Sequence, residues 1–379
     1  MTHDLKLGLS YDDVLLAPGY SDFGRDDVDL STQLTKKIQL QAPFVSSPMD
    51  TVTDSALAIA LAKEGGIGVL HRNMRIEDQA AEVAVVKKAG VLVAAAVGVG
   101  EGYKERVAAL VKAGVDAVCI DSAHGYTNLM ITAIKQSKQD YPQLQIIAGS
   151  VATYEGAKAL IEAGADALRV GMGPASICTT RIVSGMGVPQ FTAVLDCSRA
   201  GKEAGVPVIA DGGITYSGDM VKALAAGAST IMSGSLFAAT TEAPSKSYTF
   251  SRAEVPPQFA SILSDGAASY TFKQYRGMGS VGAMKEGARV NAEDEFHGKS
   301  YKDKVMVAEG VEGLLPLKGS VKDVCDQAIG GIRSGLFYVG AKSISELQQK
   351  AQFIQLTASS LRESHAHDIH ITNPGASYR

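Results

Sequence analysis

The sequence predicts a (β/α)8 barrel, also called a TIM barrel, and three observations lead to this fold class. Eight short apolar runs lie between residues 43 and 236. They alternate with amphipathic segments, a pattern typical of a parallel sheet covered by helices. Eight such units, spaced at roughly 20–40 residues, match the eight strands of this barrel.

The eight expected strands contain the apolar runs, which are rich in Val, Ile and Ala. In chain order they are 43–47, 66–70, 91–98, 117–122, 145–151, 167–172, 207–213 and 230–236. The segments SALAIALAKEG, GYKERVAALVKAG, YEGAKALIEAG and SGDMVKALAAG each end in Gly, which suits the C-terminal cap of a helix. An open doubly wound sheet is the alternative, but it usually has fewer strands and a GxGxxG turn after the first one. Here SSPMDTVTD follows the first strand instead.

The regular alternation stops between about residues 240 and 318, where the sequence is polar and shows no strong helical period. We expect a long irregular insertion after the eighth strand, projecting from the C-terminal face where barrel enzymes place their active sites. Such an insertion is usually a lid or a binding loop, and a disordered excursion is the alternative. A final pair of helices, at 320–334 and 343–361, is expected to close the barrel.

The composition limits the function classes. The chain has 379 residues, of which 46% are hydrophobic, so global disorder is excluded. A net charge of -4 gives no basis for nucleic-acid or membrane-surface binding. The sequence shows neither the run of about 18 apolar residues that a transmembrane helix needs nor the apolar core of a signal peptide. We therefore expect a single cytoplasmic domain over residues 1–379, with no nucleic-acid or membrane partner.

One of the four cysteines stands out by its position. The cysteines are scattered and contain no CxxC pair, which argues against a disulfide framework or a cysteine-rich zinc site. Cys178 follows the sixth expected strand, so it should lie at the catalytic rim, where a stabilised thiolate is a nucleophile. A buried structural cysteine is the alternative, and it is our interpretation of Cys119 and Cys197. Cys325 receives no role.

Two glycine-rich strand ends predict a phosphate site. The segments ADGG (210–213) and SGS (233–235) close the seventh and eighth strands. In barrels, these two loops frequently bind phosphate through backbone N–H groups. Asp211 could accept hydrogen bonds from ribose hydroxyls, although a strand-end Asp is often only a helix cap.

Nine segments, taken in order, resemble the IMP dehydrogenase / GMP reductase family over nearly the whole chain. They are LSYDDVLLAPGYS (9–21), SSPMDTVTD (46–54), GGIGVLHRNM (65–74), DSAHG (121–125), SICTTR (176–181), IADGGI (209–214), GSLFAATTEAP (234–244), YRGMGS (275–280) and RESHAHD (362–368). Several are highly specific, and their joint occurrence in this order would rarely arise by chance. The family fold is a TIM barrel, in agreement with the strand count.

The resemblance implies a covalent reaction on a purine 5′-monophosphate. Cys178 would attack C2 of the purine, and Thr180 and Glu309 would handle protons. The residues implied to bind the substrate are Ser47, Met49, Ser176, Asp211, Gly213, Gly234, Ser235, Tyr275, Met278 and Gly279. The residues implied to bind the cofactor, NADPH or NAD, are Asp121, Ser122, Ala123 and Gly171.

The resemblance also implies a homotetramer and a K+ site between subunits. The implied K+ ligands are Gly173, Ala175 and Cys178 of one subunit and Glu363, Ser364 and His365 of the next. Ala175 stands where the family usually has Gly. If that position requires a positive φ, alanine costs about 1 kcal/mol or more, which would weaken the site.

Two departures from the family bear on the reaction. The segment RIEDQAAEVAVVKKAGVLVAAAVG runs directly into the third strand, so the regulatory CBS pair of full-length dehydrogenases is expected to be absent. The flap KEGARVNAEDEFHGKSYKDK lacks the Arg-Tyr pair with which family dehydrogenases activate water to release the enzyme-bound intermediate. Arg289 and Tyr301 are present but far apart in sequence.

The missing Arg-Tyr pair makes GMP reductase the leading hypothesis from the sequence. That enzyme converts GMP to IMP and ammonia with NADPH and does not need the pair. The alternative is an IMP dehydrogenase, which oxidises IMP to XMP with NAD. YRGMGSVGAM, the long flap and the ESHAHD tail favour this alternative. A third hypothesis is a catalytically silent paralogue that only binds purine nucleotides.

Overall fold

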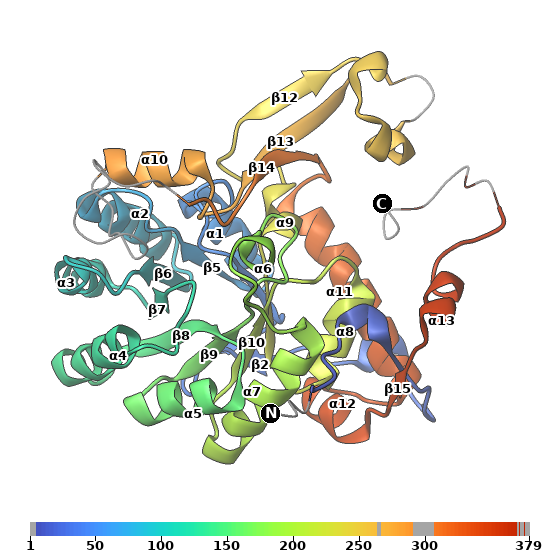
Figure 1. Ribbon diagram of the computed structural model, residues 1–379, viewed down its shortest axis with the longest axis horizontal. Coiled ribbons are helices and arrows are strands. Elements are labelled where there is room, and N and C mark those ends of the chain that lie inside the picture. Colours follow the sequence, from blue (N-terminus) through green and yellow to red (C-terminus); the bar gives the residue numbers. More distant parts are fainter. Residues whose placement is uncertain (1–4, 264–266, 291–306, 370, 372–374, 376–379) are drawn as a thin grey trace.

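Eight parallel strands form a closed barrel surrounded by helices, which confirms the predicted fold class (Figure 1). The computed structural model describes residues 5–263, 267–290, 307–369, 371 and 375. The barrel strands are β4 (Phe44–Ser46), β5 (Ile67–Leu70), β6 (Val93–Val97), β7 (Ala117–Asp121), β8 (Gln145–Val151), β9 (Ala167–Val170), β10 (Val208–Asp211) and β11 (Thr230–Ser233). The barrel closes where β11 pairs with β4, with Ser233 opposite Ser46.

The helices around the barrel follow the strands in chain order. They are α1 (Ser55–Lys63), α2 (Ile76–Lys88), α3 (Tyr103–Ala113), α4 (Asn128–Asp140), α5 (Tyr154–Ala163), α7 (Gln190–Ala204), α8 (Ser217–Ala225) and α11 (Val321–Val339). Helix α5 shows why these segments form helices. Thr153 caps its first turn by accepting a hydrogen bond from Gly156 N at 3.2 Å, and it ends at Gly164 with φ of 111°. Residues 89–92 alone connect α2 to β6.

Side chains fill the interior of the barrel. Small and branched residues from alternate positions pack inside it, among them Val45, Ala94, Ala117 and Ile209. Leu34 and Leu40 come from a hairpin of β2 (Thr32–Gln33) and β3 (Gln39–Leu40) and join this interior cluster. Cys119 belongs to the same cluster and is fully buried, as the sequence predicted.

The insertion is more regular than we predicted. Strands β12 (Ser247–Phe250), β13 (Tyr270–Arg276) and β14 (Glu312–Pro316) form an antiparallel sheet above the barrel (Figure 1). Helix α10 (Val281–Arg289) follows β13, and short 3-10 turns lie at Arg252–Glu254 and Pro257–Ile262. The prediction of an irregular stretch was therefore wrong for the described part. Because β13 and β14 are far apart in the sequence, no local sequence pattern predicts that they pair.

The C-terminal region also differs from the expectation of two closing helices. α11 matches the first, but the second resolves into α12 (Ile344–Lys350), β15 (Phe353–Gln355) and α13 (Ala358–Glu363). β15 pairs antiparallel with β1 (Val14–Leu16), which joins the two ends of the described chain. None of the described helices is both long and apolar enough to cross a membrane.

Candidate active site

The carboxyl ends of the barrel strands open into a cavity of about 1210 Å³ beneath the insertion. Protein sites for small ligands usually measure about 300–1,000 Å³, so this cavity has room for more than one ligand group. Its wall contains every predicted catalytic, substrate-binding and cofactor-binding residue. Three of the predicted K+ ligands, Gly173, Ala175 and Cys178, also line it.

A hydrogen-bonded chain joins the three predicted catalytic side chains in the cavity. The Cys178 thiol donates to Thr180 Oγ1 at 3.2 Å, and Thr180 Oγ1 donates to Glu309 Oε2 at 2.9 Å. Cys178 lies between β9 and α6 (Thr180–Val183) and is only half-buried, unlike the other three cysteines. The three groups predicted to act together are therefore in contact, and a proton can pass along them from sulfur to carboxylate.

Backbone pairing brings Glu309 to the cysteine loop. Thr179 N donates to Glu309 O at 2.9 Å, and Val311 N donates to Ile177 O at 2.9 Å. Cys178 and Gly310 thus form an antiparallel bridge. Because Glu309 N also donates to Gly279 O at 3.1 Å, the backbone of Glu309 is held on both sides, which positions its side chain toward Thr180.

Asp211 is held by an arginine that the sequence analysis missed. Arg169 Nε donates to Asp211 Oδ2 at 2.7 Å, and Nη1 contacts Asp121 Oδ1. All three side chains are at most 17% exposed. Burial raises the pKa of Asp211, and the Arg169 charge and a hydrogen bond from Ser47 oppose that rise. One cation therefore serves two carboxylates, one in the predicted ribose site and one in the predicted cofactor site.

Arg169 could have been suspected from the sequence. It is the charged residue inside the apolar run ALRVGM, and a buried charge in a barrel strand requires a partner. The sequence cannot name that partner, because Asp211 and Asp121 lie 42 and 48 residues away.

The two loops predicted to bind phosphate lie at the ends of β10 and β11, and the predicted substrate-binding residue Tyr275 lines the same cavity. Gly213 follows β10, Ser235 begins the short helix α9 (Ser235–Ala238), and Tyr275 approaches from β13. Burial raises the pKa of the Tyr275 phenol well above its ordinary value, with Asp211 as a smaller cause. The phenol is therefore protonated at neutral pH and can donate a hydrogen bond to an anion.

The predicted K+ ligands come from two separate places in the chain. Ala175 does not adopt a positive φ, since Asp368 is the one non-glycine residue with that conformation among the described residues. The strain considered for Ala175 therefore does not arise. His365 packs at the edge of Tyr216, which lines the cavity, with ring centroids 6.2 Å apart. The K+ site itself stays a prediction, and no cluster of three or more His, Cys, Asp or Glu side chains suited to a metal occurs in the described ranges.

The fold and the cavity together define a class of protein. A parallel barrel with a half-buried, hydrogen-bonded cysteine after its sixth strand and glycine turns after its last two is suited to covalent chemistry on a phosphorylated ligand. Residues 8–367 match the IMP dehydrogenase / GMP reductase domain. The chain belongs to this family and is a purine-nucleotide oxidoreductase.

Several relatives align over nearly their whole length. The inosine-5′-monophosphate dehydrogenase of Aquifex aeolicus is 39% identical, with 99% of this chain and 98% of that protein covered. The protein of the same name from Borreliella burgdorferi is 42% identical, with 96% and 98% covered. That from Cryptosporidium parvum is 40% identical, with 100% and 99% covered. The alignment with the Aquifex aeolicus protein runs over 502 positions, so that relative contains segments without a counterpart in the 379 residues here.

Proposed function

We propose that this protein is an IMP dehydrogenase that oxidises IMP to XMP with NAD. This reverses the order of the two leading hypotheses from the sequence. The hydrogen bonds that link Cys178 through Thr180 to Glu309 are the main support for the reaction class. They provide a path for the thiol proton, which a cysteine must lose before it bonds a purine carbon. The direction of the reaction is supported by the relatives, whose printed name is inosine-5′-monophosphate dehydrogenase.

The chain's own groups account for formation of the covalent bond. Glu309 accepts the proton that leaves the Cys178 thiol through the Thr180 hydroxyl, along hydrogen bonds that already run in that direction. The thiolate then adds to C2 of the purine, which splits one difficult step into two easier ones. After oxidation at C2, water replaces the sulfur, the Sγ–C2 bond breaks, and the thiol is free again.

The residues of the cofactor site fit a nicotinamide dinucleotide. Asp121 offers a carboxylate and Ser122 a hydroxyl to ribose, and both line the same cavity as Cys178. Ala123 and Gly171 add small residues to that wall, which lets a flat ring approach closely. The bound dinucleotide supplies the hydride acceptor at C2. The enclosing insertion limits access of water during that step.

GMP reductase remains a second candidate because of one sequence observation. Segment 285–304 contains no adjacent Arg and Tyr. Arg289 belongs to α10, where it pairs with Glu286 at 2.5 Å, and its side chain is 72% exposed. Tyr301 lies outside the described residues. Without the pair, water activation falls to Glu309 and Thr180, whereas a reductase would use the same two groups to help ammonia leave GMP.

An absorbance assay for reduced nicotinamide separates the candidates. The purified protein is mixed with IMP and NAD, and separately with GMP and NADPH. NADH and XMP formed from the first mixture support the proposal. NADPH consumption with GMP, without turnover of IMP, would establish the reductase. Tight nucleotide binding without turnover in either mixture would indicate the silent paralogue.

The assembly follows the same family reasoning and is part of the proposal. We propose one catalytic domain over 1–379 without a CBS pair, assembled as a homotetramer. The tail residues Glu363, Ser364 and His365 would then meet the cysteine loop of a neighbouring copy around K+. Light scattering of the purified protein, and activity with K+ replaced by Na+, test these two points.

A further inference from the structure

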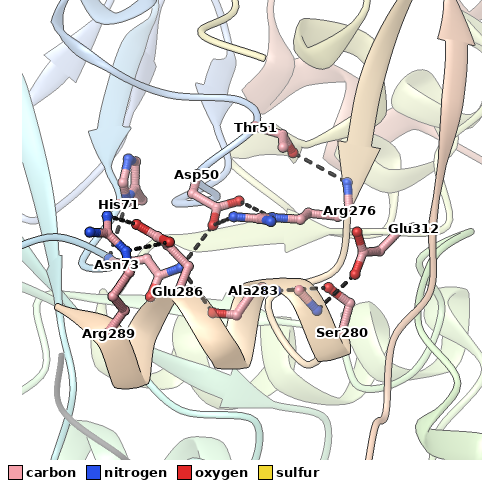
Figure 2. Close-up of polar contacts among 11 residues, drawn as sticks. Asp50, Thr51, His71, Asn73, Arg276, Ser280, Ala283, Glu286, Arg289 and Glu312 are labelled. Carbon is pink, nitrogen blue, oxygen red and sulfur yellow. Dashed lines mark hydrogen bonds and ion pairs between the residues drawn. The ribbon is translucent and has the colours of Figure 1, made fainter. Parts of the chain in front are cut away.

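A bidentate ion pair between Arg276 and Asp50 lies at the barrel rim next to α10 (Figure 2). Arg276 Nε donates to Asp50 Oδ1 at 3.0 Å, and Nη2 donates to Asp50 Oδ2 at 2.6 Å. The side chains are 18% and 8% exposed. Arg276 N also donates to Thr51 Oγ1 at 3.3 Å. The end of β13 is therefore joined to the loop after β4 by both side chain and backbone. Neither Asp50 nor Arg276 lines the cavity.

Asn73 extends this pair to α10. Its Nδ2 donates to Asp50 Oδ2 at 2.8 Å and to Ala283 O, in the first turn of the helix, at 3.1 Å. His71 Nδ1 accepts from Asn73 N at 3.2 Å, which requires that this ring nitrogen carry no proton. Burial lowers the pKa of His71 to about 4, so the imidazole is neutral at physiological pH. The neutral ring can therefore keep this contact with Asn73 N at neutral pH.

The residues just before Asp50 and Arg276 meet inside the cavity. Met49 and Tyr275 both line it. A Cβ added to Gly234 would lie 2.6 Å from Tyr275 Oη and 2.9 Å from Met49 Sδ. These three groups therefore converge with no room for a methyl group. Any shift of one loop relative to the other changes the gap into which a nucleotide must fit.

We propose that Asp50 and Arg276 are positioning residues for the purine nucleotide. Asp50 directly follows Met49 in the chain, and Arg276 directly follows Tyr275. Their ion pair fixes the spacing of the Met49 and Tyr275 side chains across the cavity. The inference rests on the proposed function only in taking the ligand to be a purine 5′-monophosphate. A planar guanidinium held at two points fixes direction as well as distance, which a lysine could not do.

Asp50→Asn is the main test, because it keeps size and an acceptor oxygen but removes the charge. We expect the KM for the nucleotide to rise about tenfold or more, while the KM for the dinucleotide stays within about twofold. Arg276→Gln should do the same, and the double variant should be no worse than either single one. Arg276→Lys should recover only part of the loss. Calorimetric binding of IMP and of GMP supplies a measure independent of turnover.

A second bidentate ion pair, between the exposed side chains of Arg75 and Asp78, provides a matched control. Arg75 Nε and Nη2 donate to Asp78 at 2.7 and 2.9 Å, and Asp78→Asn should leave both KM values unchanged. The proposal is overturned if Asp50→Asn and Arg276→Gln keep the wild-type nucleotide KM, or if their losses simply add. Equal rises in both KM values would also overturn it, since they indicate general loosening. Failure of the wild-type protein to bind IMP or GMP would instead refute the proposed function.

Discussion

The two halves of the candidate active site are built by different means. The barrel half carries Arg169 and Asp211 on strands of a closed parallel ladder, and Cys178 on the loop that follows one of these strands. The insertion half carries Tyr275 on a three-stranded sheet outside that ladder, and Glu309 on the segment just before β14. The difference shows that the barrel half is fixed by the fold itself, whereas the insertion half depends on a few identifiable contacts.

Two of those contacts lie next to the candidate site. Backbone pairing of Cys178 with Gly310 ties the insertion to the cysteine loop, and the Asp50–Arg276 pair ties it to the loop after β4. Substitutions in the barrel half should therefore alter chemistry or ligand affinity directly. Substitutions in the insertion half should mainly alter how well the two halves are aligned, except at Glu309.

The largest effect is expected in the barrel half, from Cys178→Ala. Removing the sulfur removes the covalent route, so turnover should fall by roughly 10³-fold or more. Affinity for IMP should change little, because the glycine turns and Tyr275 do not depend on the thiol. Steady-state assays and calorimetry measure the two quantities. Loss of binding together with turnover would mean that the role of the cysteine is misassigned.

Glu309→Gln tests whether the insertion half takes part in chemistry. The amide can still accept a hydrogen bond from Thr180 but cannot take a proton, so kcat should drop by about 10²–10⁴-fold. The KM for the nucleotide should remain near wild type, in contrast to the expected result for Asp50→Asn. A rate close to wild type would remove the proposed proton path.

Arg169→Gln examines the charge balance of the barrel half. It leaves Asp121 and Asp211 buried without their cation, and loss of one partner of a buried pair typically costs about 3–5 kcal/mol. We expect a lower free energy of unfolding in urea and weaker binding of both nucleotide and dinucleotide. Weaker binding of one ligand alone would show that Arg169 serves a single carboxylate.

The smallest effect is a pH dependence that arises from Asp211. Burial raises the pKa of this carboxyl group, so it takes up a proton at a higher pH than an exposed aspartate does. The KM for the nucleotide should therefore rise as pH falls through that pKa, because the protonated group is a poorer acceptor for ribose hydroxyls. Since Arg169 opposes the rise in pKa, Arg169→Gln should move the inflection to higher pH. A KM that is flat with pH in both proteins would contradict this role.

The sequence by itself determined the barrel and much of the barrel half of the site. Apolar runs such as 145–151 and helices that end at glycines such as Gly164 are local patterns. Such patterns can be recognised in the sequence because strands and helices each repeat with a characteristic period. Cys178 and Thr180 lie two residues apart, so their contact is also nearly local. The resemblance to a family added Glu309, which local patterns alone could not have placed.

Tertiary structure decided the rest. The partners Asp50 and Arg276 are 226 residues apart in the sequence. Strands β13 and β14 pair with each other although a long segment of the insertion separates them. An apolar stripe indicates which face of its own segment is buried. An ion pair or a pairing of strands depends instead on the position of a distant segment in the folded chain. The sequence therefore revealed which residues are chemically suited to act, and only the folded chain fixed which of them meet.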